Sequence, residues 1–251
     1  MIGARLLDAG NGIVLYDEQA AAVARHAVER WFDREYWGPA GTPLREKTGR
    51  AGVIVLDHGD EKWVLRHYNR GGFIARFVRD HYVWTGIERT RAFREWRLLA
   101  RLRRLQLPVP RPIAARVLRR GLLYRADIVT GLLPGARPLS AALDDGGPAR
   151  ERWADIGRML RAFHDHGVQH PDLTAHNILL GPEGGVFLVD FDNASIRAPG
   201  KWREAGLARL QRSLRKIALE TGAAFDPETW SLLDKAYRAG AEEAHRASAG
   251  L

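Results

Sequence analysis

Two short polar motifs, separated by a predicted hairpin, constrain the fold of this chain more than any other feature. The first, His170-Pro-Asp-Leu-Thr-Ala-His-Asn177, lies between a predicted helix and a predicted strand. The second, Val189-Asp-Phe-Asp192, ends the partner strand of that hairpin. Because the open ends of two antiparallel strands lie side by side, we expect Asp172, Asn177 and Asp190 to meet at one end of the hairpin.

This set of oxygen-bearing side chains suits phosphoryl transfer from ATP. The reaction needs a carboxylate that faces the acceptor hydroxyl, and carboxylate and amide oxygens that hold Mg²⁺ on the phosphates. Asn177 and Asp190 are chemically sensible ligands, because Mg²⁺ takes one or two hard protein oxygens and keeps several waters. Two such motifs around a hairpin match the catalytic-loop and metal-binding signatures of kinases. The plainer alternative is that these are polar turn residues that cap strands.

The chain before residue 131 is predicted to combine strands with two helices. Hairpins are expected over 53–66 and 113–129, because runs of strand-forming residues flank turn signals in both. The spacing of apolar residues predicts helices over 17–37 and 73–106. A run of prolines then ends the second helix.

The chain after residue 131 is predicted to be mostly helical around one small hairpin at 178–189. Two apolar stripes at helical spacing predict two buried helix faces. They are Trp153, Ile156, Leu160 and Phe163 on one helix, and Leu207, Leu210, Leu214 and Ile217 on another. Asp226 and Pro227 are expected to begin the last helix as its cap and its first residue.

This segregation of strands and helices predicts an α+β fold in two lobes. We expect an N-terminal antiparallel sheet with one long helix over residues 1–130, of which 1–37 form an N-terminal extension. A mostly helical C-terminal lobe is expected over 131–251. The glycines and prolines between Thr130 and Pro138 mark the boundary.

The two polar motifs resemble those of the protein-kinase-like superfamily, and the resemblance extends through most of the chain. Further fragments resemble the 3-deoxy-D-manno-octulosonic acid (Kdo) kinase family of that superfamily. They lie at residues 65–72, 84–86, 91–99, 107–112 and 207–214. The resemblance implies a two-lobed protein-kinase-like fold, with a nucleotide-binding lobe over 1–130 and a catalytic lobe over 131–251.

The resemblance also implies an activity. It implies transfer of the ATP γ-phosphate to the 4-hydroxyl of Kdo on Kdo-lipid A, in the synthesis of the lipopolysaccharide inner core. Asp172 would be the catalytic base, and Asn177 and Asp190 would be the ligands of Mg²⁺. His170 would brace the metal-binding loop. The family resemblance further implies a peripheral enzyme on the cytoplasmic face of the bacterial inner membrane.

Arg66 and Glu95 are the candidates for an ion pair in the N-terminal lobe like the Lys–Glu pair of kinases. Arg66 stands where the superfamily has a Lys that reaches the ATP phosphates, and a guanidinium can also fork onto phosphate oxygens. Lys62, on the same strand face, is the competing candidate. Glu95 shares an apolar helix face with Ala92 and Leu99, so its carboxylate needs a buried partner. Arg66 is the expected partner, and the alternative is that Glu95 reaches solvent.

The loop Thr48-Gly-Arg-Ala-Gly52 is the candidate phosphate-covering loop. It offers Gly49, Arg50 and Gly52 for contact with the nucleotide, although such glycine turns are common. Its place before the Arg66 strand favours the phosphate contact.

Three departures from protein kinases bear on the acceptor. Pro171 replaces the Arg that would pair with an activation-loop phosphate, and no Ala-Pro-Glu element follows Asp192. Control by activation-loop phosphorylation is therefore not expected, and a small or lipid-linked acceptor is favoured over a peptide. Asp192 replaces a Gly, and it is either a further metal ligand or a cap.

The net charge of +9 and a pI near 10.3 indicate an anionic partner. The stretches 73–84 and 89–104 mix bulky apolar residues with arginines, and they could contact an anionic bilayer or the lipid A phosphates. The alternative is a core helix with a solvated basic face. No helix-turn-helix or RNP signature occurs, so we expect no nucleic-acid partner.

Composition narrows the remaining classes. The chain has no Cys, which excludes disulfides and thiol catalysis, and no apolar run approaches the length of a membrane span. A soluble, cytoplasmic protein is expected. Besides a Kdo kinase, the sequence leaves open a lipopolysaccharide heptose kinase, another small-molecule phosphotransferase, and a catalytically silent pseudokinase that only binds nucleotide.

Overall fold

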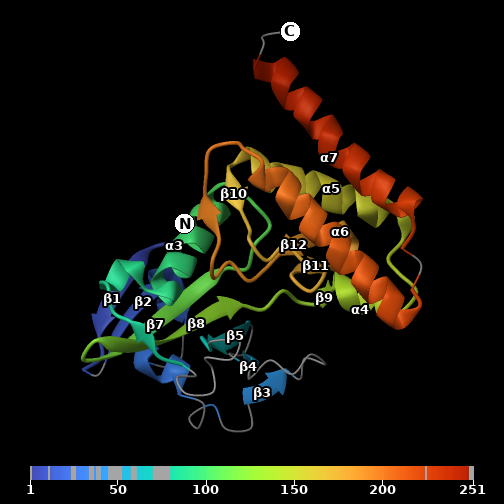
Figure 1. Cartoon of the computed structure of the whole chain (residues 1–251). Helices are drawn as coiled ribbons and strands as arrows, with labels where there is room; N and C mark the ends of the chain where they lie inside the picture. Colours follow the sequence, from blue (N-terminus) through green and yellow to red (C-terminus); the bar gives the residue numbers. More distant parts are fainter. Residues whose placement is uncertain are drawn as a thin grey trace. The chain divides into compact units, whose positions relative to one another are not determined.

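The computed structural model describes residues 2–10, 12–23, 27–33, 37, 41–44, 53–57, 61–69, 80–223 and 225–248 (Figure 1). The chain forms two compact units. Unit 1 comprises residues 1–105 and 110–132, and unit 2 comprises residues 106–109 and 133–251. The segment 106–109 thus differs from the expected division at residue 130. It belongs with unit 2 because the carbonyl of Pro108 accepts a hydrogen bond from the Leu188 amide, at 3.1 Å.

Unit 1 is built on an antiparallel sheet. Its described strands follow the order β1-β2-β7-β8-β5-β4-β3 (Figure 1). Strand β6 pairs with the beginning of β8. The strands are β1 (Ala4–Asp8), β2 (Ile13–Asp17), β3 (Gly41–Leu44), β4 (Val53–Asp57), β5 (Lys62–His67), β6 (Tyr82–Val83), β7 (Pro112–Arg120) and β8 (Leu123–Gly131). Both predicted hairpins are confirmed, because β4 pairs with β5 and β7 pairs with β8.

The helix predicted over 17–37 is wrong. The chain instead forms β2 up to Asp17, then the short α1 (Glu18–Val23) and the 3₁₀ turn η1 (Val28–Phe32). Asp17 is fully buried, accepts a hydrogen bond from the Gly3 amide and pairs with Arg111 at 2.8 Å. These contacts hold residue 17 in the sheet. Since β1 and β2 are strands of that sheet, the start of the chain is part of unit 1 rather than an extension of it.

The helix predicted over 73–106 begins later than expected. Residues 70–79 lie outside the described part of the chain, and β6 and the 3₁₀ turn η4 (Ile87–Arg89) precede α3 (Arg91–Arg104). Gly86 has φ +112°, a backbone region that side chains disfavour. Thr90 then caps η4 by donating its hydroxyl hydrogen to the carbonyl of Ile87, at 2.6 Å. Helix α3 ends before the prolines, as predicted.

The two faces of the unit 1 sheet are covered by different segments. On one face, Trp31 of η1 packs edge-on against Trp63 of β5, with ring centroids 4.9 Å apart. Arg66 lies three residues further along β5 and therefore points to the opposite face, where it meets Glu95 of α3. Helix α3 packs against β7 and β8 and buries Phe93, Trp96, Leu99 and Leu102. The site of Glu95 is thus an apolar layer between helix and sheet.

Unit 2 is mostly helical, as predicted, so the α+β fold class is confirmed. Its helices are α4 (Leu139–Asp144), α5 (Arg150–Asp165), α6 (Trp202–Thr221) and α7 (Pro227–Ser248), with the 3₁₀ turn η5 (Pro182–Gly184). Its strands are β9 (Arg137–Pro138), β10 (Val168–Gln169), β11 (Ile178–Leu180), β12 (Val186–Leu188) and β13 (Ser195–Ile196). Asp226 caps α7 by accepting a hydrogen bond from the Thr229 amide at 2.7 Å, as expected.

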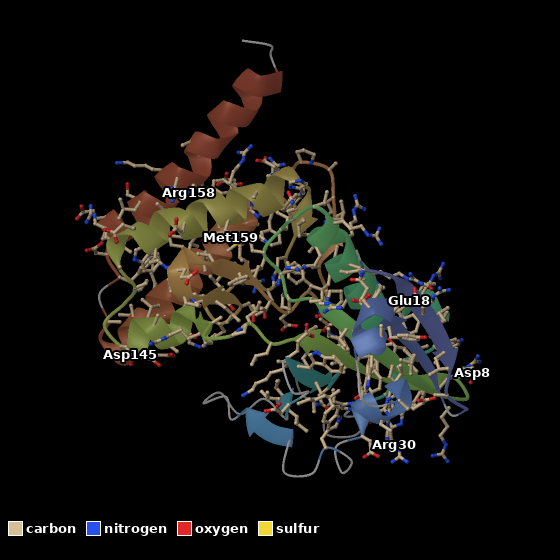
Figure 2. All side chains as sticks on the ribbon, turned by 180° about the vertical axis from the view of Figure 1, so that it is seen from behind. Asp8, Glu18, Arg30, Asp145, Arg158 and Met159 are labelled. Carbon is tan, nitrogen blue, oxygen red and sulfur yellow. The ribbon has the colours of Figure 1, made fainter. Side chains whose placement is uncertain are left out.

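The two predicted helix stripes are buried in unit 2. Figure 2 shows Arg158 and Met159 on α5, which packs along α7, and Asp145 just beyond the end of α4. The contact between α5 and α7 is close at Gly157, where a Cβ atom would lie 2.2 Å from the carbonyl oxygen of Leu233. Only glycine allows the two backbones to approach this closely.

The α5–α7 contact also buries His164. Its Nδ1 lies 2.7 Å from the hydroxyl of Tyr237, and its ring packs edge-on against Trp202. Burial, with Arg203 nearby, lowers the pKa of His164 from 6.5 to about 4. The fold therefore holds this imidazole neutral in a range of pH where an unfolded chain would protonate it.

We expect acid to destabilise unit 2 for this reason. Below pH about 6.5 the unfolded state gains a proton at His164 that the folded state refuses. The contribution of His164 to the free energy of unfolding should fall by about 1.4 kcal/mol per pH unit between pH 6.5 and 4, and stay level above 6.5. Urea unfolding followed by circular dichroism across this range measures the slope. His164→Asn should reduce it, and His166→Asn, an exposed neighbour, should not; equal slopes in both variants would contradict the assignment.

Candidate active site

The first polar motif forms a loop between β10 and β11 that is closed by its own side chains. Asn177 is buried, and its Nδ2 donates to the main-chain oxygen of Asp172 at 2.8 Å and to the Asp172 carboxylate at 3.3 Å. The Asn177 amide also donates to the carbonyl of Thr174, at 3.1 Å. The loop thus fixes the Asp172 carboxylate, which is half exposed, beside the Asn177 amide.

The hairpin brings the second motif to the same place. Ile178 of β11 is opposite Leu188 of β12, and the amide of Val189 donates to the carbonyl of Asn177 at 3.0 Å. Asp190 is the next residue, so it follows directly beside Asn177. The structure therefore brings Asp172, Asn177 and Asp190 to one end of the hairpin, as the sequence predicts.

Asp190 has a backbone conformation that the sequence did not indicate. Its φ is +65°, in the left-handed region that non-glycine residues rarely adopt, although Asp tolerates it better than most. Such strained residues gather at functional sites. The outlier falls on a residue that the motif had already singled out.

His170, the first residue of the first motif, contacts two residues of the second motif. Its Nε2 lies 3.0 Å from the carbonyl of Val189, and its ring packs edge-on against Phe191. Burial lowers the pKa of His170, so it donates as a neutral imidazole. Its Nδ1 is buried and has no hydrogen-bond partner within the described residues. These contacts fit the bracing role that the resemblance implies.

Helix α6 supports the loop, a contact that sequence reasoning missed. The hydroxyl oxygen of Ser213 accepts a hydrogen bond from the Ala175 amide at 3.2 Å, and the Ala175 carbonyl accepts one from the Ser140 amide at 3.1 Å. Arg209, one turn earlier on α6, lies 4.0 Å from the Asp172 carboxylate. The stripe of leucines predicts that α6 is buried, but nothing in the sequence indicates what it packs against.

In unit 1, Arg66 and Glu95 form the predicted ion pair. Nη2 of Arg66 lies 2.6 and 2.5 Å from the two carboxylate oxygens of Glu95, whose side chain is only 3% exposed. The hydroxyl of Tyr68 donates to the same carboxylate at 2.5 Å. Tyr68 was not among the predicted residues. The only sequence signal for it is that it lies two positions after Arg66, which would place both side chains on the same face of an extended chain. The alternative that Glu95 reaches solvent is wrong.

Lys62, the competing candidate, lies elsewhere. Its side chain is 56% exposed and its Nζ is 3.9 Å from a carboxylate oxygen of Asp57 on the neighbouring strand. It therefore does not take part in the buried pair with Glu95. Gly49, Arg50 and Gly52, the candidate phosphate-covering residues, lie outside the described residues.

Both halves of a protein-kinase-like phosphotransferase are present in this chain. Unit 1 supplies the sheet, the helix and the Arg–Glu pair, and unit 2 supplies the loop and hairpin that gather three hard oxygen donors. A family model described as the lipopolysaccharide kinase (Kdo/WaaP) family matches residues 34–237. The chain belongs to this family, whose members are phosphotransferases that act on an alcohol group.

Individual relatives are similar over most of their length. A Stenotrophomonas maltophilia (strain K279a) protein named 3-deoxy-D-manno-octulosonic acid kinase is 41% identical over 230 residues, which cover 91% of this chain and 90% of the relative. Proteins of the same name from Xanthomonas campestris pv. campestris (strain B100) and Xylella fastidiosa (strain M12) are 43% and 42% identical. They cover 83% and 82% of this chain, and 82% of each relative.

The donors at the hairpin fit the nucleotide and metal that a kinase uses. Asn177 Nδ2 donates to two oxygens of Asp172, and within the described residues no protein group donates to the Asn177 amide oxygen. An amide oxygen beside an Asp carboxylate is a set that Mg²⁺ accepts and softer metals do not prefer. Asn177 and Asp190 are therefore the residues that would hold Mg²⁺.

Removing Glu95 should damage unit 1 more than removing an exposed glutamate does. Glu95→Ala leaves the Arg66 guanidinium and the Tyr68 hydroxyl without their shared carboxylate, and we expect a loss of about 3 kcal/mol in the free energy of unfolding. Use of ATP should weaken as well, through a higher KM for ATP. The matched control is Glu88→Ala, which breaks an exposed pair with Arg97 and should cost little. Equal losses in urea unfolding of the two variants would contradict a buried, structural pair.

Proposed function

We propose that this protein transfers the γ-phosphate of ATP to the 4-hydroxyl of the Kdo residue of Kdo-lipid A, in synthesis of the lipopolysaccharide inner core. The observation that carries the proposal is the loop that fixes the Asp172 carboxylate beside Asn177, in a chain similar over 91% of its length to a protein named 3-deoxy-D-manno-octulosonic acid kinase. The same site would serve a heptose kinase or another small-molecule phosphotransferase, so the acceptor is the part under test.

Each residue of the site has one task in this proposal. Asp172 accepts a hydrogen bond from the acceptor hydroxyl, orients it towards the phosphorus, and takes its proton late in the reaction. Asn177 and Asp190 would hold Mg²⁺, which would neutralise charge on the phosphates. Arg66, fixed by Glu95, contacts the phosphates from unit 1.

The direct test supplies several acceptors to one enzyme. The protein is incubated with labelled ATP and Mg²⁺ together with Kdo-lipid A, heptosylated lipid A or free sugars, and NMR of the product locates the new phosphate. Label on the Kdo C4 oxygen supports the proposal. Label on heptose would show that the protein is a heptose kinase. Nucleotide binding with no turnover would show that it is a pseudokinase.

Asp172→Ala should separate binding from transfer. Loss of a general base lowers the rate by about 10²–10⁴-fold, while binding of Mg·ATP, which uses Asn177 and Asp190, should be largely kept. Isothermal titration with a non-hydrolysable ATP analogue measures the binding, and the labelled assay measures the transfer. Asp145→Ala, at the end of α4, is the control and should keep both. Full turnover in Asp172→Ala would remove its role as base.

We also propose that the enzyme works as a peripheral protein on the cytoplasmic face of the inner membrane. Within the described residues, no helix is long and apolar enough to cross a bilayer. The apolar face of α3 is buried against the sheet, so this helix offers a bilayer only its exposed arginines. A membrane contact that inserts apolar side chains therefore needs another surface.

The tip of the β7–β8 hairpin offers such a surface, which we call the hairpin apex. Three apolar side chains stand out there, with Leu122 80%, Val83 62% and Leu123 38% exposed. Val83 and Leu123 are paired across β6 and β8, so they share one face. Three exposed arginines lie within three positions of Leu122 along the hairpin, Arg119, Arg120 and Arg125. Exposed apolar side chains can insert into a bilayer, and neighbouring cations can pair with anionic lipid headgroups.

The absence of Cys allows a clean test of the hairpin apex. Leu122→Cys, labelled with an environment-sensitive dye, should shift to shorter emission wavelengths when vesicles of phosphatidylglycerol and phosphatidylethanolamine are added. Labelled Leu219→Cys is the matched control, because Leu219 is a similarly exposed leucine, 87% exposed, on α6 and outside the hairpin apex. Binding to the vesicles with no shift at position 122 would place the contact elsewhere, and absence of binding would remove the membrane proposal.

A further inference from the structure

One face of α6 is turned towards the loop that carries Asp172. Gly206, Arg209 and Ser213 are spaced at helical intervals and lie on this face. A Cβ at Gly206 would be in ordinary contact, 3.6 Å, with the Leu173 side chain, and the Ser213 hydroxyl accepts from the Ala175 amide at 3.2 Å. The contacts before and after Arg209 therefore fix the helix against the loop, and Arg209 takes its position from them.

Arg209 contributes little to holding this arrangement together. Its Nη1 lies 4.0 Å from the Asp172 carboxylate, at the outer limit of an ion pair, and both side chains are 50% exposed. Pairs of this length and exposure add little to stability. Ser213 and the leucines of α6 already anchor the helix. A cation of small structural value thus stands beside the carboxylate proposed to face the acceptor.

The positive charge of Arg209 beside Asp172 bears on how an anionic acceptor could bind. An acceptor that carries a carboxylate must bring that negative group close to Asp172, which repels it. A guanidinium next to Asp172 offsets the repulsion, and its planar fork matches a carboxylate through two parallel hydrogen bonds. We propose that Arg209 binds the carboxylate of the acceptor sugar and thereby positions its hydroxyl at Asp172. This inference rests on the proposed function, in which the acceptor is an acid sugar.

Other cations of α6 do not share this placement. Arg203 donates to the carbonyl of His164 at 2.7 Å, and Lys216 lies 3.8 Å from Glu220. Arg212 is exposed and lies three residues from Arg209, and Asp172 has no described contact with it. Arg212→Gln therefore changes the net charge as Arg209→Gln does, about one turn further along the helix, without touching the proposed contact.

The test compares Arg209→Gln, Arg209→Lys and Arg212→Gln in steady-state assays with Kdo-lipid A. Loss of one charge-assisted contact should raise the KM for the acceptor by about 10- to 100-fold in Arg209→Gln. The kcat should change less, and the KM for ATP should stay the same. Arg209→Lys keeps the charge but not the fork, so its KM should lie between those of the wild type and Arg209→Gln. The urea unfolding midpoint of Arg209→Gln should equal that of the wild type. If Arg209 had a structural role, the midpoint would fall.

A second substrate separates the acceptor carboxylate from the ATP phosphates. The methyl ester of the Kdo carboxylate should be a poor acceptor for the wild type, and Arg209→Gln should scarcely distinguish ester from acid. A raised KM for ATP would instead assign Arg209 to the nucleotide and overturn the inference. Equal effects of Arg209→Gln and Arg212→Gln would overturn it too, as a general effect of charge. If the wild type fails to phosphorylate Kdo-lipid A, the proposed function fails first.

Discussion

The hydrogen bond from the Val189 amide to the Asn177 carbonyl is the contact on which the site depends. It closes the hairpin at the end where both polar motifs lie, and it fixes the distance between a loop and a strand end that come from different parts of the chain. His170 reinforces it by donating to the carbonyl of the same Val189. A main-chain bond does not depend on which side chain is present at either position. The relative placement of Asn177 and Asp190 is therefore set by the backbone, and the side chains supply the chemistry.

Much of the fold could be predicted because it follows local patterns. The hairpin at 178–189 and the stripes of α5 and α6 have the periodicity of their elements, and Glu95 was recognisable as a carboxylate in an apolar stripe. The helix over 17–37 was wrong because helical spacing could not reveal that Asp17 is tied to Arg111, a residue 94 positions away. Arg209 and Tyr68 were missed for the same reason. Contacts between distant segments leave no periodic signal in either segment.

The arginine content of the chain also has an internal use that composition does not reveal. Each buried carboxylate described in unit 1 has an arginine from another segment of the chain: Asp17 has Arg111, Glu95 has Arg66, and Asp127 has Arg116. Burial alone would raise the pKa of Asp127, but His67 and Arg116 outweigh it and lower the pKa instead. Part of the positive charge therefore neutralises the interior, and only the exposed remainder can attract an anionic partner.

The close approach of α5 and α7 at Gly157 is connected, through a series of contacts, to the loop that carries Asp172. The same glycine faces the main-chain nitrogen of Tyr237, so a methyl group there would push α7 outwards at the turn that carries Tyr237. Tyr237 is the hydroxyl partner of His164, and the His164 carbonyl in turn receives Arg203 from α6, the helix that supports the loop. A single methyl group added at residue 157 would therefore disturb, through these contacts, the helix that supports the Asp172 loop.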